Sequence, residues 1–193
     1  MDKLPNALLI SLVLAFSQAG HAQDWEVLFD GSDLDNFYPL GEAEWNIVDD
    51  YVEADGYTGS FLVTNEAYGD FELELEFWPS MDANSGVYVR NSDPQAIAAR
   101  AGYEINIFDT NENADNRTGS IVFFSAPLAE VETGGKWNKY VIKAEGNRIT
   151  VHLDGVLVAD LEDDTYASGP IALQNNGGLI RFRNIRVKKT DAD

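Results

Sequence analysis

Short runs of alternating apolar and polar residues occupy most of the chain, and residues typical of turns separate them. In Phe71–Phe77 the odd-numbered residues are Phe or Leu, and the even-numbered residues are all Glu. A period of two is typical of strands that bury one face, and no long stretch shows the helical 3.6-residue period. The strands that this pattern predicts are Trp45–Val48, Tyr51–Ala54, Phe61–Thr64, Phe71–Phe77, Val87–Arg90, Tyr103–Phe108, Ile121–Phe124, Trp137–Glu145, Arg148–Leu153, Val156–Leu161, Pro170–Gln174 and Leu179–Val187.

Tight turns join several of these strands. Asp154-Gly155 is a strong signal for a two-residue hairpin, because Gly tolerates a positive φ, and Gly146-Asn147 marks another reversal. We expect Asp93–Ala101 to form a loop with a short helical turn. Without any linker or internal repeat, about a dozen antiparallel strands favour an all-β fold. The expected architecture is a two-sheet antiparallel β-sandwich, or jelly roll, whose apolar faces meet between the sheets.

The first 22 residues differ from the rest of the chain. Residues 7–16 form an apolar run after Lys3, and Gly20 and Ala22 fit the small-x-small pattern of a cleavage site. The run is too short to span a bilayer, which favours a signal peptide over a membrane anchor. We therefore expect removal of residues 1–22 and a single domain over residues 23–193. The expected location is periplasmic or extracellular, with no insertion into a membrane.

The composition narrows the available chemistry. The chain has no Cys and two His, and only His152 remains after the predicted cleavage. This excludes disulfides, a thiol nucleophile and a His-rich zinc site. The net charge of −20 predicts repulsion from nucleic acid phosphates and from anionic membrane surfaces. Carboxylates, amides, Arg, Lys, Tyr and hydroxyl groups remain as candidates, and the oligomeric state stays open.

Several segments, spread in order over nearly the whole mature chain, are similar to one known family. They are Val27-Leu28-Phe29-Asp30-Gly31, Tyr68-Gly69-Asp70-Phe71-Glu72, Asn84-Ser85-Gly86-Val87-Tyr88-Val89-Arg90, Gly102-Tyr103-Glu104-Ile105-Asn106-Ile107-Phe108-Asp109, Thr118-Gly119-Ser120, Trp137-Asn138, Gly169-Pro170-Ile171-Ala172-Leu173-Gln174 and Phe182-Arg183-Asn184-Ile185. Together they resemble the 3-keto-disaccharide hydrolase domain family, formerly a domain of unknown function. The resemblance implies a concanavalin A-like lectin and glucanase fold, and cleavage of glycosides already oxidised at the sugar C3.

The chain departs from the pattern of that family at three places. Asn106 stands where the family usually has Gln, and Asn176 stands at the His of a Leu-Gln-x-His-Gly string. Lys136 precedes Trp137, where the family often has Gly-Glu. If that His transfers protons in the relatives, this chain reacts at a different rate or on a different substrate. The alternative is that it binds a carbohydrate without cleaving it.

Glu104 and Asp109 are the candidate catalytic carboxylates. Retaining glucanases of this fold carry the pattern E-x-D-x-x-E on one strand, and Glu104, Asn106 and Asp109 have the same spacing. Strict alternation turns Asp109 away from Glu104, so a shared face requires a β-bulge near residues 107–108. With that bulge the two carboxylates can divide the base and acid roles. The alternative is that Glu104 and Asn106 are ordinary solvent-face residues.

Other candidates are Tyr88 and Arg90, on the polar side of their predicted strand, and Gln174 and Asn176, which lie two apart at the end of a late strand. Arg90, as a third catalytic group, could neutralise Glu104, orient a sugar hydroxyl or stabilise an oxyanion, or it could form a structural ion pair. The expected substrate-binding residues offer an aromatic ring, a phenolic hydroxyl or an amide. They are Tyr88, Asn106, Gln174 and Asn176.

No metal or cofactor is required by this chemistry. Asp109, Asn111, Asn113 and Asp115 alternate in a loop that could hold Ca²⁺, but the full ligand spacing of an EF-hand is missing. The Ca²⁺ reading is therefore possible but unsupported, and we expect no metal site.

The expected function is that of a glycoside hydrolase-like enzyme that cleaves 3-keto-disaccharides or 3-keto-glycosides. Glu104 would remove the acidic C2 proton, Arg90 or an amide would stabilise the enolate, and Asp109 would protonate the leaving oxygen. Water would then complete net hydrolysis. The alternatives are a direct two-carboxylate hydrolysis and a non-catalytic carbohydrate-binding module. In each case the partner is a carbohydrate, and no nucleic acid is expected.

Overall fold

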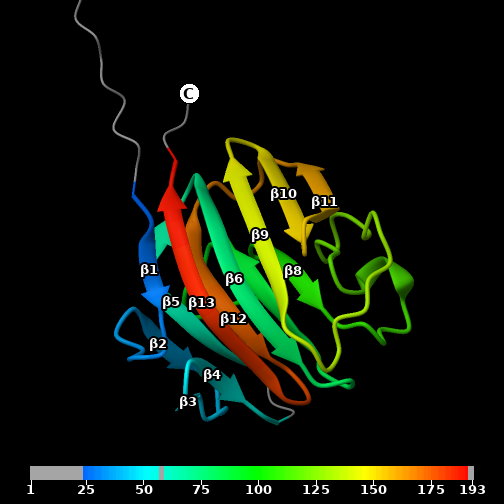
Figure 1. Cartoon of the computed structure of the whole chain (residues 1–193). Helices are drawn as coiled ribbons and strands as arrows, with labels where there is room; N and C mark the ends of the chain where they lie inside the picture. The colour runs from blue at the N-terminus through cyan, green and yellow to red at the C-terminus, as the bar shows by residue number, and fades with distance from the viewer. Residues whose placement is uncertain (1–23, 57–58, 191–193) are drawn as a thin grey trace, which may run out of the picture.

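Thirteen β-strands and one 3₁₀ turn make up the regular structure of residues 24–56 and 59–190, the part that this computed structural model describes (Figure 1). The signal peptide expected at residues 1–22 lies outside the described residues. Within the described part, no helix has the length and apolar character needed to cross a bilayer. The 3₁₀ turn is η1 (Ala114–Asn116).

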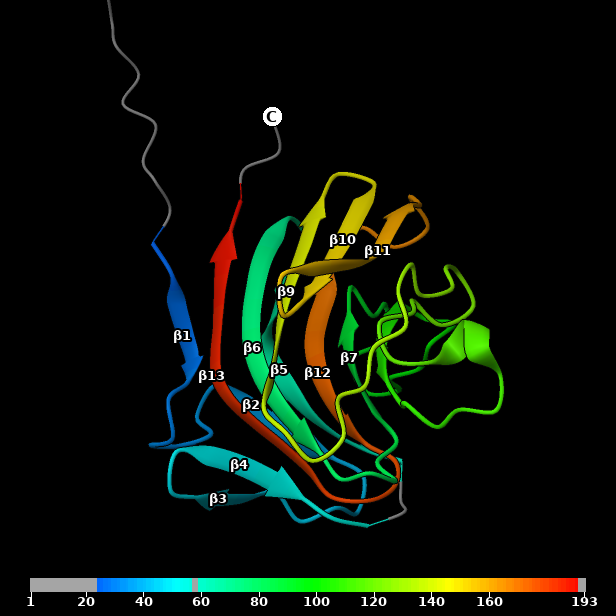
Figure 2. The same ribbon diagram turned by 45° about the vertical axis from the view of Figure 1, so that its right-hand side comes forward.

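The strands form two antiparallel sheets, which confirms the predicted sandwich (Figure 2). The larger sheet has the order β11-β10-β9-β6-β13-β4-β3, with β1 also paired to β13, and the smaller has the order β2-β5-β12-β7-β8. The larger sheet contains β1 (Glu26–Phe29), β3 (Asn46–Val48), β4 (Tyr51–Ala54), β6 (Phe71–Pro79), β9 (Asn138–Glu145), β10 (Arg148–Leu153), β11 (Val156–Glu162) and β13 (Ile180–Lys189). The smaller contains β2 (Phe37–Leu40), β5 (Ser60–Tyr68), β7 (Ser85–Val89), β8 (Tyr103–Ile107) and β12 (Gly169–Asn175).

The core lies between the sheets because alternate side chains of each strand point inward. Along β6, the apolar residues from Phe71 to Phe77 are at most 1% exposed, and the intervening glutamates are partly exposed. Phe77 packs against Tyr140 of β9 with ring centroids 4.6 Å apart. Burial of these large apolar side chains supplies the main driving force for folding, as the absence of Cys requires.

The outer face of the larger sheet is covered by ion pairs. Glu74 of β6 pairs with Lys139 of β9 and Arg186 of β13, and Glu72 pairs with Lys143 and Lys188 in the same way. These carboxylates therefore have cationic partners on both neighbouring strands. The candidate catalytic residues lie on the smaller sheet instead.

One predicted strand was wrong. Ile121–Phe124 is not a strand, because the chain reverses at once: Ile121 and Ser125 exchange two backbone hydrogen bonds of 2.9 and 2.8 Å. Asp93–Ala101 is a loop, as expected, and it contains turns but no helix. The strands β1 and β2 were not predicted, and β2 contains Pro39, which an edge strand tolerates.

The Asp154-Gly155 hairpin turn between β10 and β11 is confirmed. Leu153 pairs with Val156, so the turn has two residues, and both have a positive φ, 48° for Asp154 and 83° for Gly155. This is the geometry that matches the twist of the flanking strands.

Candidate functional site

Two rows of side chains cross the outer face of the smaller sheet. Tyr88 of β7 lies opposite Glu104 of β8, and Ala172 of β12 lies on the other side of Tyr88. The second row is one register step away, where Gly86 lies opposite Asn106. The first row is Tyr38, Val63, Ala172, Tyr88 and Glu104, and the second is Leu40, Phe61, Gln174, Gly86 and Asn106.

The segment Gly119–Val122 extends both rows beyond the edge strand β8. Three backbone hydrogen bonds of 3.0 Å join it to β8, including one from the Val122 amide to the Glu104 carbonyl. Together with the Ile105–Ile121 bridge, they place Ser120 beside Asn106 and Val122 beside Glu104. The loops after β8, coloured green to yellow-green, lie next to β7 and β8 in Figures 1 and 2.

An apolar cluster separate from the main core covers part of this face. Phe61, Val63, Tyr88 and Ala172 pack together, and Ile97 from the β7–β8 loop packs onto them with 8% of its surface exposed. Tyr88, which lies opposite Glu104, is only 4% exposed within this cluster.

A hydrogen-bonded chain connects three of the predicted site residues. The Gln174 Nε2 group donates to the Tyr88 hydroxyl at 2.9 Å. The Tyr88 hydroxyl in turn hydrogen-bonds the Glu104 carboxyl group, which lies directly across from it. Since Nε2 has only protons to offer, the Tyr88 proton is directed toward Glu104.

Burial sets the proton affinity of Glu104. The side chain is 8% exposed, and desolvation raises its pKa to about 7, although the hydrogen bond from Tyr88 opposes the shift. Burial and the nearby Glu104 charge raise the pKa of Tyr88, so this phenol keeps its proton. A carboxyl group with a pKa near 7 suits general acid or base catalysis at neutral pH.

Gly86 makes room for the Glu104 side chain. A Cβ atom at Gly86 would lie 3.3 Å from both Cγ and Oε1 of Glu104 and 3.2 Å from the Ile105 carbonyl oxygen. Beside Gly86, Gln174 is 6% exposed, and its Oε1 atom has no hydrogen-bond partner within the described structure. A buried acceptor without a partner is costly, so Oε1 is a candidate site for a ligand hydroxyl.

The two predicted Asn residues lie on the same face as Glu104. Asn106 donates through Nδ2 to the Asn116 carbonyl and accepts at Oδ1 from the Ile107 amide. Asn176 is exposed just beyond β12, where its backbone N–H group donates to the Asn84 carbonyl at 2.9 Å. The structure thus brings together Tyr88, Glu104, Asn106, Gln174 and Asn176.

Arg90 does not join this group. It lies just beyond β7 with φ of 52°, and the guanidinium group is 1% exposed. It donates to the carbonyls of Gly69 and Gly146 and to the Asp70 carboxylate, at 2.8 to 2.9 Å. The positive φ breaks the expected alternation, and Arg90 forms the structural ion pair that was the alternative.

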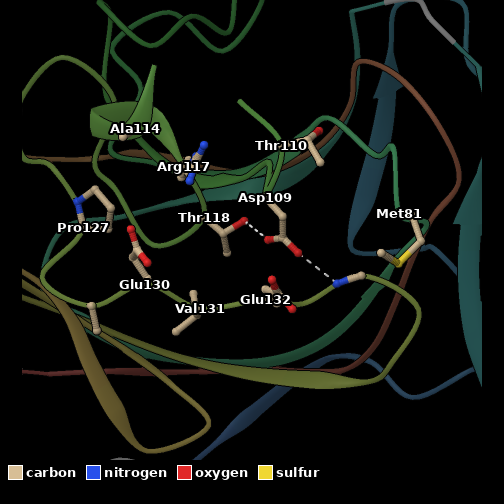
Figure 3. Close-up of a pocket in the computed structure, with 12 residues that line it drawn as sticks. Met81, Asp109, Thr110, Ala114, Arg117, Thr118, Pro127, Glu130, Val131 and Glu132 are labelled. Carbon is tan, nitrogen blue, oxygen red and sulfur yellow. Dashed lines mark hydrogen bonds between the residues drawn. The ribbon is translucent and has the colours of Figure 1, made fainter. Parts of the chain in front are cut away.

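Asp109 does not join this group either, and Figure 3 shows its carboxylate directed toward Thr118. β7 and β8 pair without a register shift, so the bulge needed to turn Asp109 to the shared face is absent from this pair. The Asp109 carboxylate accepts hydrogen bonds from both Thr118 and Thr133 hydroxyls and from the amides of Thr133 and Gly134. These four donors occupy the carboxylate, so Asp109 ties the loops after β8 together.

The loop expected as a possible Ca²⁺ site is occupied by its own hydrogen bonds. Asn111 Oδ1 accepts from the Asn113 amide, and Asn113 Oδ1 accepts from the Asp115 amide. Among residues 24–56 and 59–190, no group of three or more His, Cys, Asp or Glu side chains could hold a metal ion.

Three further residues of this face were not singled out from the sequence. Gly86, Ser120 and Val122 join it through strand register, which a single sequence does not reveal. Gly86 lies directly before the strand predicted at Val87–Arg90, and this was the one available signal, because Gly at a strand often marks a close approach.

One family model matches nearly all of the described chain. It is described as the 3-keto-alpha-glucoside-1,2-lyase-like domain, and the match covers residues 24–188. No curated protein matches this sequence.

Solved structures share the fold. A protein described as a glycosyl hydrolase from Parabacteroides distasonis is 26% identical, with a TM-score of 0.74, over 86% of this chain and 100% of that chain. A carbohydrate-binding module from Bacillus subtilis is 18% identical, with a TM-score of 0.65, over 80% and 96%. A prokaryotic beta-1,3-1,4-glucanase derived from a mouse hindgut metagenome is 13% identical, with a TM-score of 0.59, over 87% and 99%. The predicted lectin- and glucanase-like sandwich is thereby confirmed.

Proposed function

The chain belongs to the 3-keto-alpha-glucoside-1,2-lyase-like domain family, and we propose that it cleaves glycosides whose sugar is oxidised at C3. The family and the glycosyl hydrolase neighbour support a carbohydrate-related, hydrolase-like activity. The proposal adds the oxidised substrate, the elimination route and action outside the cytoplasm after loss of residues 1–22.

One observation carries the chemical proposal: Glu104 is the single carboxylate in the two described rows of side chains, and its pKa lies near 7. A direct hydrolysis by two carboxylates needs a second acid across the glycosidic bond. An elimination needs one base, because a ketone at C3 acidifies the C2 proton. This favours elimination over the two-carboxylate route.

In the proposed reaction, ionised Glu104 takes the proton from C2 of the 3-keto sugar. The electron pair of the C2–H bond passes through the enolate and forms a C1–C2 double bond as the C1–O bond breaks. The leaving oxygen takes the proton that Glu104 removed from C2, which regenerates ionised Glu104, and water then adds across the double bond to give net hydrolysis. In this scheme the Tyr88 hydroxyl, which lies opposite Glu104, donates a hydrogen bond to the enolate oxygen once Glu104 holds a proton.

The amide groups are proposed to position the sugar. Gln174 presents an unpartnered Oε1 beside Gly86, and Asn176 presents an exposed amide one register step further. Asn106 is committed to the Asn116 carbonyl, so its role is to hold the loop against β8 as well as to line the site.

The test is to supply a 3-keto-disaccharide and the same disaccharide with an unoxidised C3 hydroxyl. We expect turnover of the keto sugar alone, and loss of about 100-fold or more in Glu104→Gln, which keeps the shape but removes the base. Equal turnover of both sugars, or full activity of Glu104→Gln, would contradict the elimination.

A non-catalytic carbohydrate-binding module is the second candidate function. Two observations favour it: the likeness to the carbohydrate-binding module of Bacillus subtilis and Asn176 at the position where the family motif has His. Titration calorimetry with a glycan panel, combined with product analysis, separates the two functions. Binding without turnover over a broad set of 3-keto sugars would support the module.

A further inference from the structure

A cavity of about 410 Å³ lies beside the edge strand β8, between η1 and the tight turn at Ile121–Ser125. Its walls combine aromatic rings with uncharged polar groups and one carboxylate. The lining residues used below are Phe123, Phe124, Asn113, Asn116, Asp115 and Ser125. Aromatic surface with a few polar groups is the usual lining of a small-molecule site.

Both walls of this cavity are attached to the candidate site. On one side, the Val122 amide donates to the Glu104 carbonyl at 3.0 Å, and Phe123 is the next residue. On the other side, Asn106 Nδ2 donates to the carbonyl of Asn116, which ends η1. The cavity is therefore fixed next to Glu104 by two contacts to β8.

Phe123 has an unusual conformation for a bulky residue. Its φ is 71°, in the left-handed region that Gly occupies most easily, and the side chain is 58% exposed. The Arg100 guanidinium lies 3.8 Å from the ring centroid and covers one face of the ring. The residue is nevertheless 58% exposed, so part of its ring remains accessible to a ligand. A strained residue with an exposed aromatic ring next to a candidate site points to function.

We infer that this cavity is a second sugar-binding subsite, in which an uncharged pyranose stacks its C–H face on Phe123. The amides of Asn113 and Asn116 and the Ser125 hydroxyl supply hydrogen-bond partners for its hydroxyl groups. Asp115 and the net charge of −20 disfavour an anionic sugar. This inference rests on the proposed function in one respect: the ring at Glu104 is the oxidised sugar, so the ring at Phe123 is the leaving sugar.

The experiment compares a 3-keto-disaccharide with the methyl 3-keto-glucoside, which has no second ring. In Phe123→Gly we expect kcat/KM for the disaccharide to fall about fivefold or more, while the value for the methyl glycoside stays unchanged. Since Gly accommodates a φ of 71°, the melting temperature should not fall, so lost activity is not lost folding. Phe123→Trp should keep the preference for the disaccharide.

The matched control is Leu128→Ala. Leu128 is 59% exposed and lies in the same loop region, but it does not line this cavity. We expect no change for either substrate. Equal losses on both substrates in Phe123→Gly, or no loss on the disaccharide, would overturn the inference.

A binding measurement separates this inference from the proposed function. If the wild-type protein cleaves neither keto substrate, the elimination fails, and calorimetry with the unoxidised disaccharide and the methyl glucoside still tests the subsite. Tighter binding of the disaccharide that is lost in Phe123→Gly supports the subsite. A disaccharide that binds no tighter than the methyl glucoside overturns it.

Discussion

Tyr88 and Glu104 lie directly opposite each other on β7 and β8, and the Tyr88 hydroxyl hydrogen-bonds the Glu104 carboxyl group. Desolvation raises the pKa of Glu104 to about 7, and the hydrogen bond from Tyr88 lowers it. Two opposing effects therefore set the pKa of the proposed base: burial raises it, and the Tyr88 hydroxyl group lowers it.

Tyr88→Phe should raise the pKa of Glu104. The ring and its packing against Phe61 remain, but the donor that stabilises the ionised carboxylate is lost. The pKa of Glu104 then rises above 7, so the rise of kcat/KM with pH should move to higher pH. The measurement is the pH profile of kcat/KM for a 3-keto-glycoside in both proteins. If the rising part of this pH profile moves to lower pH, or does not move, the assignment of Glu104 as the base is contradicted.

Glu104→Gln should change how stability depends on pH. The folded-state pKa of about 7 lies above the ordinary value of 4.5, so the wild-type protein loses stability as pH rises between these values. Gln carries no such penalty, so at pH 8 the variant should be more stable by about 3 kcal/mol, with little difference below about pH 4. Urea unfolding at both pH values measures this.

Glu130→Gln is the control for that experiment, because it removes one negative charge at a solvent-exposed position. We expect it to follow the wild-type stability at both pH values. An equal gain in both variants would show that net charge, and not burial of Glu104, is the cause.

Gly86→Ala should disturb Glu104 directly. The new methyl group would lie 3.3 Å from Glu104 Cγ and Oε1, closer than ordinary van der Waals contact. We expect a loss of about 1–2 kcal/mol in unfolding free energy and about tenfold in kcat/KM, because the carboxylate is displaced. In Gly69→Ala the nearest atom is 3.6 Å away, so this control should keep wild-type activity.

Asp109→Asn distinguishes a structural carboxylate from a catalytic acid. Asp109 accepts four hydrogen bonds that anchor the loops after β8, so loss of its charge should cost about 1–2 kcal/mol of stability. We expect kcat to stay within a few-fold of the wild-type value. A proton donor would behave in the opposite way, with an unchanged melting temperature and a loss of about 100-fold or more. Thermal unfolding and steady-state kinetics on one preparation decide between them.

The sequence by itself determined the sandwich and the side of each strand that faces the core. Period-two patterning is local information, because successive side chains of a strand must point to opposite faces. The alternating pattern of β6 therefore predicted which of its faces is buried. Asp154-Gly155 predicted the turn between β10 and β11. For the same reason Tyr88, Glu104 and Asn106 could be placed on outer faces from the sequence.

Only the tertiary structure decided which of these side chains meet. Strand order and register join Tyr88 to Glu104 and place Gln174 beside Gly86, and these depend on contacts between segments far apart in the sequence. Arg90 and Asp109 follow their strands at loop positions, where alternation no longer holds. Their hydrogen bonds to distant groups fixed where they point, and Phe123 became visible as a candidate contact only once its turn was folded beside β8.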